Sequence, residues 1–307
     1  MATATLVSTA PRRLGPSDLV VGPIGFGTWR LTGTDVRAAG YLLDAAIDAM
    51  PEGARLLVDA ADVYGLDWGG TGFGTVEEHL GAVLAAVPAR RDRIVLATKG
   101  GIVPPVPYDS SPSALRAACD ASRRRLGTET IDLYQVHRPD LLTHPAEVAA
   151  TLDGFVAAGT VRTLGVSNHT PAQQEALAAH LTAPIATTQP EWSVAHLAPM
   201  RDGTLDLAVR VGTTPLAWSP LAGGRVADGD GLRPELLTTL DDLANREGVD
   251  RSTVAVAFLL AHPANAVAVL GTQRAERFTD LTTRVAIHLD RADCYRIVAD
   301  SEGVPLP

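Results

Sequence analysis

Short apolar segments alternate with longer amphipathic segments along almost the whole chain. The short segments are rich in Val, Ile and Leu, which is typical of buried parallel strands, whereas the longer ones repeat apolar residues with the period of a helix. We expect strands at Ile24–Gly27, Leu56–Asp59, Ile94–Thr98, Leu133–Val136, Thr163–Val166, Ala186–Gln189, Pro215–Trp218 and Ala266–Leu270. We expect helices at Val36–Met50, Val76–Val87, Ser113–Leu126, Ala146–Ala158, Ala172–His180, Gly203–Val211, Pro234–Ala261 in two pieces, and Ala275–Arg284.

Eight strand and helix pairs in series predict a closed (β/α)8 TIM barrel, an α/β fold in which residues 1–307 form one domain. Before the first strand, residues 13–20 predict a short N-terminal hairpin that plugs the lower end of the barrel. After the last pair, Leu289–Ser301 predicts an extra C-terminal helix. Chemistry in such a barrel takes place at the carboxyl ends of the strands.

Composition narrows the function to small-molecule chemistry. The net charge is −9 without a basic tail, so a nucleic-acid surface is not expected. No apolar stretch reaches about 18 residues, so no membrane span is expected. The two cysteines, Cys119 and Cys294, are far apart in sequence, which fits a reducing environment. We therefore expect a cytoplasmic protein with a small-molecule partner and no metal.

The chain contains a single lysine. Of its 26 basic residues, 25 are arginine and one is Lys99. A position that retains lysine in such an arginine-rich chain indicates a need for a compact amine that arginine cannot supply. The alternative is an ordinary surface lysine.

Four ionisable side chains follow successive predicted strands. Asp59 and Tyr64 follow the second strand, Lys99 the third and His137 the fourth, so all four are expected to converge. An ammonium beside a phenol favours the phenolate, which predicts that Lys99 lowers the pKa of Tyr64. Asp59 would hold Lys99 charged, and His137 would bond a substrate carbonyl. Taken singly, each residue also has a structural interpretation: a turn former, a rim residue or a core histidine.

A second group of residues suits a nucleotide. Ser167, Asn168 and Gln189 end strands with groups that pair with a carboxamide, and Trp218 offers a face for a heteroaromatic ring. The glycines that follow Trp218 allow close approach to phosphate. The loop at residues 271–277 carries free amides, a helix N-terminus and two arginines, which favours an anion. Rim packing and an ordinary capped helix are the structural alternatives.

These residues resemble the aldo-keto reductase superfamily, and the resemblance extends from the hairpin to the last helix. Asp59, Tyr64, Lys99 and His137 match its catalytic tetrad, and the tail is similar to a bacterial branch of predicted oxidoreductases. The resemblance implies cofactor contacts at Ser167, Asn168, Gln189, Trp218, Ser219, Leu221, Gly223, Gly271, Thr272, Arg274 and Arg277. It also implies a substrate pocket bordered by Trp29, Trp68, His169 and Trp192.

The activity implied by the resemblance is reversible, NADPH-dependent reduction of aldehydes and ketones. Tyr64 would act as general acid, tuned by Lys99 and Asp59. Arg277, helped by Arg274, would contact the 2′-phosphate and favour NADP, with NAD possible. Leu281 stands where many members place an adenine-contacting Asn, so that contact is expected to be missing.

Two other functions remain open from the sequence alone. A sole lysine at a strand end also fits a Schiff-base aldolase, and a barrel of this kind can serve as a nicotinamide-binding regulatory protein. A Rossmann domain is disfavoured, because Arg30 and Glu77 stand where a third glycine should fall. The sequence leaves the substrate and the oligomeric state, monomer or small homo-oligomer, undetermined.

Overall fold

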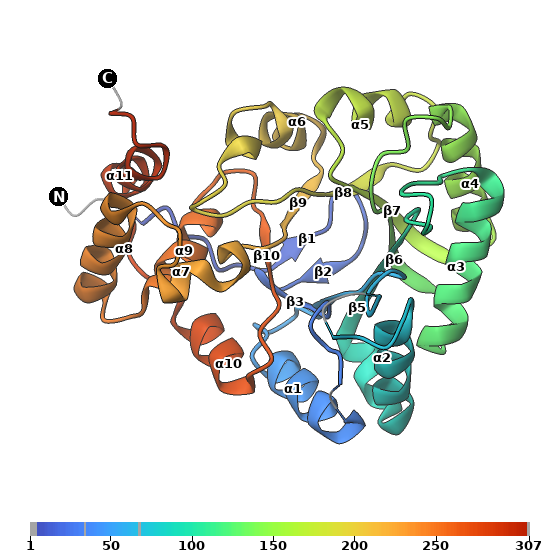
Figure 1. The fold of residues 1–307 in the computed structure, drawn as a ribbon, viewed down its shortest axis with the longest axis horizontal. Helices are drawn as coiled ribbons and strands as arrows, with labels where there is room; N and C mark the ends of the chain where they lie inside the picture. The colour runs from blue at the N-terminus through green and yellow to red at the C-terminus, as the bar shows by residue number, and fades with distance from the viewer. Residues whose placement is uncertain (1–4, 34, 67–68, 306–307) are drawn as a thin grey trace.

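Eight parallel strands close into a barrel in the computed structural model, which describes residues 5–33, 35–66 and 69–305 (Figure 1). The barrel order is β10-β3-β4-β5-β6-β7-β8-β9, with every neighbouring pair parallel. The strands are β3 (Ile24–Gly27), β4 (Leu56–Asp59), β5 (Ile94–Gly100), β6 (Ile131–Val136), β7 (Val161–Ser167), β8 (Ile185–Gln189), β9 (Thr214–Ala217) and β10 (Val267–Leu270). The predicted barrel is therefore confirmed.

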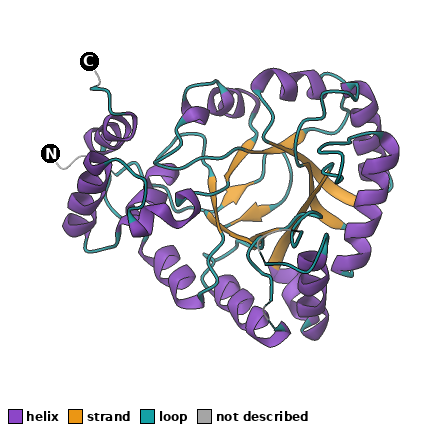
Figure 2. Cartoon of the chain, in the orientation of Figure 1, coloured by secondary structure: helices purple, strands orange, loops and turns teal. Residues whose placement is uncertain are grey.

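Helices surround the barrel, and Figure 2 shows them as an outer layer around the strands. They are α1 (Val36–Asp48), α2 (Thr75–Ala86), α3 (Pro112–Leu126), α4 (Pro145–Ala157), α5 (Pro171–Ala178), α6 (Thr204–Val211), α7 (Arg225–Asp228), α8 (Pro234–Glu247), α9 (Arg251–Leu260), α10 (Ala275–Arg284) and α11 (Arg291–Glu302). Short 3-10 helices lie at Pro88–Arg93, Ala198–Met200 and Ala222–Gly224. The expected extra helix is α11, and it packs against α8.

Several helix starts are explained by their capping residues. Ser111 and Thr170 accept backbone N–H groups at the starts of α3 and α5, each followed by proline at the first helical position. Gly127 ends α3 in the left-handed conformation, with φ of 64°. The 3-10 helices and α7 were not predicted, because each is too short to show a periodic pattern.

The barrel interior is apolar toward the amino ends of the strands and polar toward their carboxyl ends. The lower interior contains Leu57, Val95, Ala97, Leu133, Leu216, Val267 and Val269. Because alternate residues of a strand face the same side, the residue two positions further also points inward: Asp59 after Leu57, Lys99 after Ala97, and Gln135 after Leu133. The polar layer thus lies at the carboxyl ends of the strands.

The hairpin β1 (Arg12–Arg13) and β2 (Val20–Val21) packs against this apolar layer. Leu14 and Leu19 in its turn are fully buried. Gly15 lies so close to the Ala186 backbone that a Cβ there would be 2.6 Å from the Ala186 carbonyl oxygen. The hairpin therefore plugs the lower end of the barrel, as the sequence predicted.

Candidate active site

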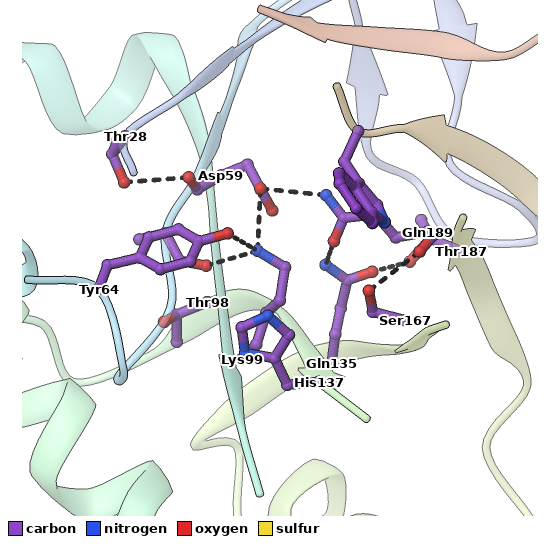
Figure 3. A network of polar contacts seen from close by, with 12 residues as sticks. Thr28, Asp59, Tyr64, Thr98, Lys99, Gln135, His137, Ser167, Thr187 and Gln189 are labelled. Atoms are coloured by element: carbon purple, nitrogen blue, oxygen red, sulfur yellow. Dashed lines mark hydrogen bonds and ion pairs between the residues drawn. The ribbon is translucent and has the colours of Figure 1, made fainter. Parts of the chain in front are cut away.

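The four ionisable residues expected at successive strand ends lie together (Figure 3). Asp59 is the last residue of β4, and its carbonyl oxygen accepts the Thr28 amide at 3.0 Å. Tyr64 lies in the turn that follows. Lys99 is on β5 and His137 directly follows β6. Because the four side chains come from neighbouring strand ends, the barrel itself brings them together.

Lys99 uses all three of its N–H bonds inside the protein. Nζ donates to Asp59 Oδ2 at 2.9 Å, to the Ala60 carbonyl oxygen at 2.9 Å and to the Tyr64 hydroxyl oxygen at 3.1 Å. Since an ammonium has three donors, Tyr64 receives a hydrogen bond from Lys99 and keeps its own O–H available. The phenol is therefore set up to donate a proton away from Lys99.

The charge states of this pair follow from burial and neighbours. Burial by itself lowers the pKa of Lys99, but the Asp59 carboxylate and the Tyr64 hydroxyl outweigh it, so this pKa is raised and the amine is protonated at neutral pH. A protonated amine is not a nucleophile. These contacts argue against the Schiff-base alternative.

The pKa of Tyr64 differs from the sequence expectation. Burial raises it, and although the Lys99 ammonium lowers it, the Asp59 carboxylate raises it again, so the net shift is upward. The expectation of an acidified phenol was therefore wrong, because sequence reasoning counted the ammonium and not the desolvation. Tyr64 is a neutral phenol at neutral pH.

His137 is a neutral imidazole beside this phenol. Its ring meets the Tyr64 ring edge to face, with centroids 5.9 Å apart. Burial, and then the charges of Lys99 and Arg138, hold the pKa of His137 well below its usual value. Nδ1 is buried without a hydrogen-bond partner among the described residues. A neutral His137 can donate a hydrogen bond without carrying a charge.

A chain of buried amide and hydroxyl groups reaches Asp59 from the opposite side of the barrel. Thr187 donates its hydroxyl to Gln135 Oε1 at 3.0 Å, Gln135 Nε2 donates to Gln189 Oε1 at 2.8 Å, and Gln189 Nε2 donates to Asp59 Oδ2 at 3.0 Å. We call Thr187, Gln135 and Gln189 the amide chain. Gln135 was missed from the sequence, although its position two residues before His137 places it on the same strand face.

Three residues expected to hold a carboxamide are bonded to their neighbours. Ser167 donates its hydroxyl to the Gln189 carbonyl oxygen at 2.9 Å, and Asn168 Nδ2 donates to that hydroxyl at 2.8 Å. Asn168 Oδ1 accepts the Trp218 indole N–H at 3.0 Å. Lone pairs of Ser167 and Asn168 and one Gln189 N–H remain for a ligand. The Trp218 ring is thus fixed at the end of β9, where a flat heteroaromatic group can stack on it.

The loop after Trp218 has a backbone suited to phosphate. Ser219, Ala222, Gly223 and Gly224 all have positive φ, between 51° and 109°. Arg30, from the loop after β3, donates to the Gly223 carbonyl oxygen at 2.9 Å and ties the two loops together. Leu221 packs against the core beneath the loop. The Ala222 and Gly224 N–H groups donate within the loop, to the Ser219 and Leu221 carbonyl oxygens, so the other N–H groups of this tightly turned backbone are the ones available to an anion.

A second candidate for anion binding lies at the start of α10. Gly271 and Thr272 connect β10 to this helix, and no side chain caps its first turn. Arg274 and Arg277 are exposed, and neither has an ion-pair partner among the described residues. An uncapped N-terminus with two free guanidinium groups fits a nucleotide phosphate. Leu281, further along α10, is buried in the core.

The four residues expected around the substrate pocket lie in different environments. Trp29 is 38% exposed after β3, and the His169 ring nitrogen Nδ1 contacts the Ser167 carbonyl oxygen at 2.9 Å. Trp68 lies outside the described residues. Trp192 was assigned wrongly: it is 0% exposed and packs edge to face on His262 within the core, so it cannot border an open pocket. The chain turns after β8 and carries the indole inward.

No group of three or more His, Cys, Asp or Glu side chains in the described part of the chain is arranged to hold a metal ion. Among the helices described, none combines the length and the apolar character that crossing a bilayer requires.

Comparisons with known proteins agree on one family. Residues 23–301 match the model of the aldo/keto reductase family. The chain is 46% identical over 299 residues to a 6-dehydroglucose reductase of Novosphingobium aromaticivorans, with 96% of this chain and 97% of the relative covered. It is 33% identical to a 6-dehydroglucose reductase of Agrobacterium fabrum, with 93% of this chain and 96% of the relative covered.

A solved structure shares the fold. A thermostable aldo-keto reductase in complex with the inhibitor epalrestat matches with a TM-score of 0.80, covering 94% of this chain and 99% of that chain at 24% identity. At this identity the likeness shows the barrel architecture alone.

Proposed function

The chain belongs to the aldo/keto reductase family of oxidoreductases, and we propose that it is an NADPH-dependent reductase of aldehydes and ketones with Tyr64 as the general acid. The observation that carries the proposal is the set of contacts around Lys99. Its three N–H bonds go to Asp59, Ala60 and Tyr64, so the Tyr64 hydroxyl accepts from Lys99 and its own proton remains available to a carbonyl oxygen.

Each of the four catalytic residues then has one role. Tyr64 donates its proton to the carbonyl oxygen of the substrate. Lys99 stabilises the phenolate that this transfer leaves behind, and Asp59 holds Lys99 in position. His137, a neutral imidazole, donates a hydrogen bond that orients the carbonyl group. Since Tyr64 starts as a neutral phenol at neutral pH, the resting site has the protonation state that reduction needs.

The cofactor residues support NADPH as the partner of this site. When bound, the cofactor supplies the hydride and this chain supplies the proton. Ser167, Asn168 and Gln189 would hold the carboxamide, and Trp218 would cover the ring. The loop that includes Ser219, Leu221 and Gly223 would bind the pyrophosphate through its backbone. Gly271, Thr272, Arg274 and Arg277 would bind the adenosine phosphate, and the two unpaired guanidinium groups support NADP over NAD.

We further propose that the substrates include oxygen-rich aldehydes. The relative at 46% identity is a 6-dehydroglucose reductase, and a sugar aldehyde of that kind carries hydroxyl groups beside its carbonyl. Arg138 supports this class. It follows His137, is half-buried, has no ion-pair or hydrogen-bond partner among the described residues, and acts electrostatically on both Tyr64 and His137. A free guanidinium there can donate hydrogen bonds to substrate hydroxyls.

A panel of aldehydes tests the proposed function. We expect NADPH-dependent reduction of 6-dehydroglucose, of glyceraldehyde and of a simple aryl aldehyde such as nitrobenzaldehyde. The loss of NADPH absorbance measures the rate of each reaction. Tight NADPH binding without turnover of any of these would refute the reductase and support the regulatory alternative. Turnover that is as fast with NADH at equal concentration would refute the cofactor preference.

A further inference from the structure

The amide chain is a single buried path that ends on the same oxygen as Lys99. Gln135 and Thr187 are not exposed at all, and Gln189 is 1% exposed. Asp59 Oδ2 accepts both Gln189 Nε2 and Lys99 Nζ, whereas Asp59 Oδ1 has no partner among the described residues. Figure 3 shows this path running across the barrel from Thr187 to Tyr64.

The charge of Asp59 sets the direction of every bond in the path. A carboxylate only accepts hydrogen bonds, so Gln189 must turn its N–H toward Asp59 and its oxygen away. Gln135 must then donate to that oxygen and present its own oxygen to Thr187, whose hydroxyl donates. A glutamine can take this place because one amide group both donates and accepts.

Gly165 on β7 leaves the space that this path needs. Gly165 on β7 pairs with Gln135 on β6 and with Thr187 on β8. A Cβ at Gly165 would collide with the Thr187 hydroxyl and lie 3.0 Å from Gln135 Oε1. The absence of a side chain at position 165 is therefore what allows Gln135 and Thr187 to meet across β7.

We propose that Gln135 is a positioning residue for the reductase reaction: by holding the Gln189 oxygen, it keeps the Gln189 N–H on Asp59 and thereby keeps Asp59 aligned with Lys99 and Tyr64. Without Gln135, the buried Gln189 oxygen loses its donor, so the Gln189 amide shifts toward another partner and its N–H contact to Asp59 weakens. Asp59 then moves, which disturbs the contact from Lys99 to Tyr64. This inference rests on the proposed function, because it assigns a role within that reaction.

The first test is Gln135→Met, which preserves length and removes both hydrogen bonds. We expect kcat to fall about tenfold, the size expected for one misdirected buried hydrogen bond, while KM for the carbonyl compound stays near the wild-type value. Because the Asp59 carboxylate raises the pKa of Tyr64, a less neutralised Asp59 should move the alkaline limb of the pH profile upward. Gln174→Met is the matched control: it changes a buried glutamine on α5, and we expect neither effect.

The second test is Gln135→Glu, which gives a result that a purely structural role would not produce. Below its pKa, the introduced carboxyl group can donate to Gln189 and accept from Thr187, as the native amide does. Above its pKa it cannot donate, and it attracts the Gln189 N–H away from Asp59. We expect kcat close to the wild-type value at low pH and a decline as pH rises through a range where the wild type is constant.

The outcomes separate this proposal from the function on which it rests. A folded Gln135→Met variant with wild-type kcat and pH profile, or a Gln135→Glu variant without the additional decline, would overturn the role of Gln135. A wild-type protein that reduces no aldehyde would overturn the proposed function instead. In that case, ultraviolet titration of Tyr64 tests the role of Gln135, and the Tyr64 signal is the tyrosinate absorbance that Tyr64→Phe lacks. A higher pKa of Tyr64 in Gln135→Met supports the positioning role, and an unchanged pKa refutes it.

Discussion

The edge of one ring faces the plane of the other where Tyr64 meets His137, with an interplanar angle of 79°. Because this contact depends on the rings, Tyr64→Phe should keep the packing of the site and remove only the hydroxyl. We expect the reduction rate to fall about 10²- to 10⁴-fold, the usual contribution of a general acid, with NADPH affinity nearly unchanged. Steady-state kinetics and NADPH fluorescence titration measure the two quantities. A variant that retains comparable turnover would remove Tyr64 from the mechanism.

The pH profile should reflect the raised pKa of Tyr64. Reduction needs the protonated phenol, so kcat/KM should fall with rising pH only above the ordinary tyrosine pKa of about 10. The low pKa of His137 means that its charge does not change through the neutral range. We therefore expect a flat profile across neutral pH. An alkaline limb near neutrality would instead support the acidified phenol that the sequence suggested.

Arg277→Ala should weaken NADPH more than NADH. One charge-assisted contact is worth about 1.5–3 kcal/mol, which is about 10- to 150-fold in Kd for the cofactor that carries the 2′-phosphate. Arg284→Ala, at the other end of α10, is the control and should affect neither cofactor. Equal losses of NADPH and NADH binding in Arg277→Ala would locate the 2′-phosphate elsewhere.

Arg138→Gln should discriminate between substrates. If Arg138 binds hydroxyl groups, kcat/KM should fall about tenfold or more for glyceraldehyde and 6-dehydroglucose. An unsubstituted aliphatic aldehyde, which offers no such group, should lose much less. Arg116→Gln, on the exposed side of α3, controls for the change in net charge. Equal losses for both kinds of aldehyde would contradict a role in substrate selection.

Asp62 should make the stability of the protein depend on pH. Burial first, and the Glu77 carboxylate second, raise its pKa from the ordinary value of 3.8 to about 8, although Arg125 opposes them. The folded state therefore favours the protonated acid, and the free energy of unfolding should fall as pH rises from about 4 to about 8. Asp62→Asn removes this loss. We expect its Tm to exceed that of the wild type at pH 8 by a margin that narrows toward pH 4. A margin independent of pH would contradict this.

The fold was predictable because its signal is repeated. The bounds of Ile24–Gly27 and Leu56–Asp59 agree with β3 and β4, and eight such segments alternating with helices leave few alternatives to a closed barrel. The extent of other strands was less predictable. β7 runs from Val161 to Ser167, longer than its apolar centre, because pairing with neighbours on both sides extends it.

The sequence predicted which ionisable residues form the site, but it did not predict their pKa values. Strand ends converge in a barrel, so the four ionisable residues could be grouped from their order alone. The pKa of Tyr64 depends on how much solvent the fold removes, which the sequence does not state. Trp192 shows the same limit, since a residue after a strand end can turn toward the mouth or toward the core. The role of Gln135 could not be predicted from the sequence, because it depends on the space that Gly165 on β7 leaves between Gln135 on β6 and Thr187 on β8.

The single lysine also affects how readily aldehydes modify the protein covalently. Simple monoaldehydes condense with unprotonated alkyl amines to form imines, whereas guanidinium groups remain protonated and do not form imines with them. Lys99 is 1% exposed and its ammonium is shared among three acceptors. The chain therefore offers no lysine on its surface for glycation, and an enzyme built this way can work in concentrated aldehyde without being cross-linked through its lysines.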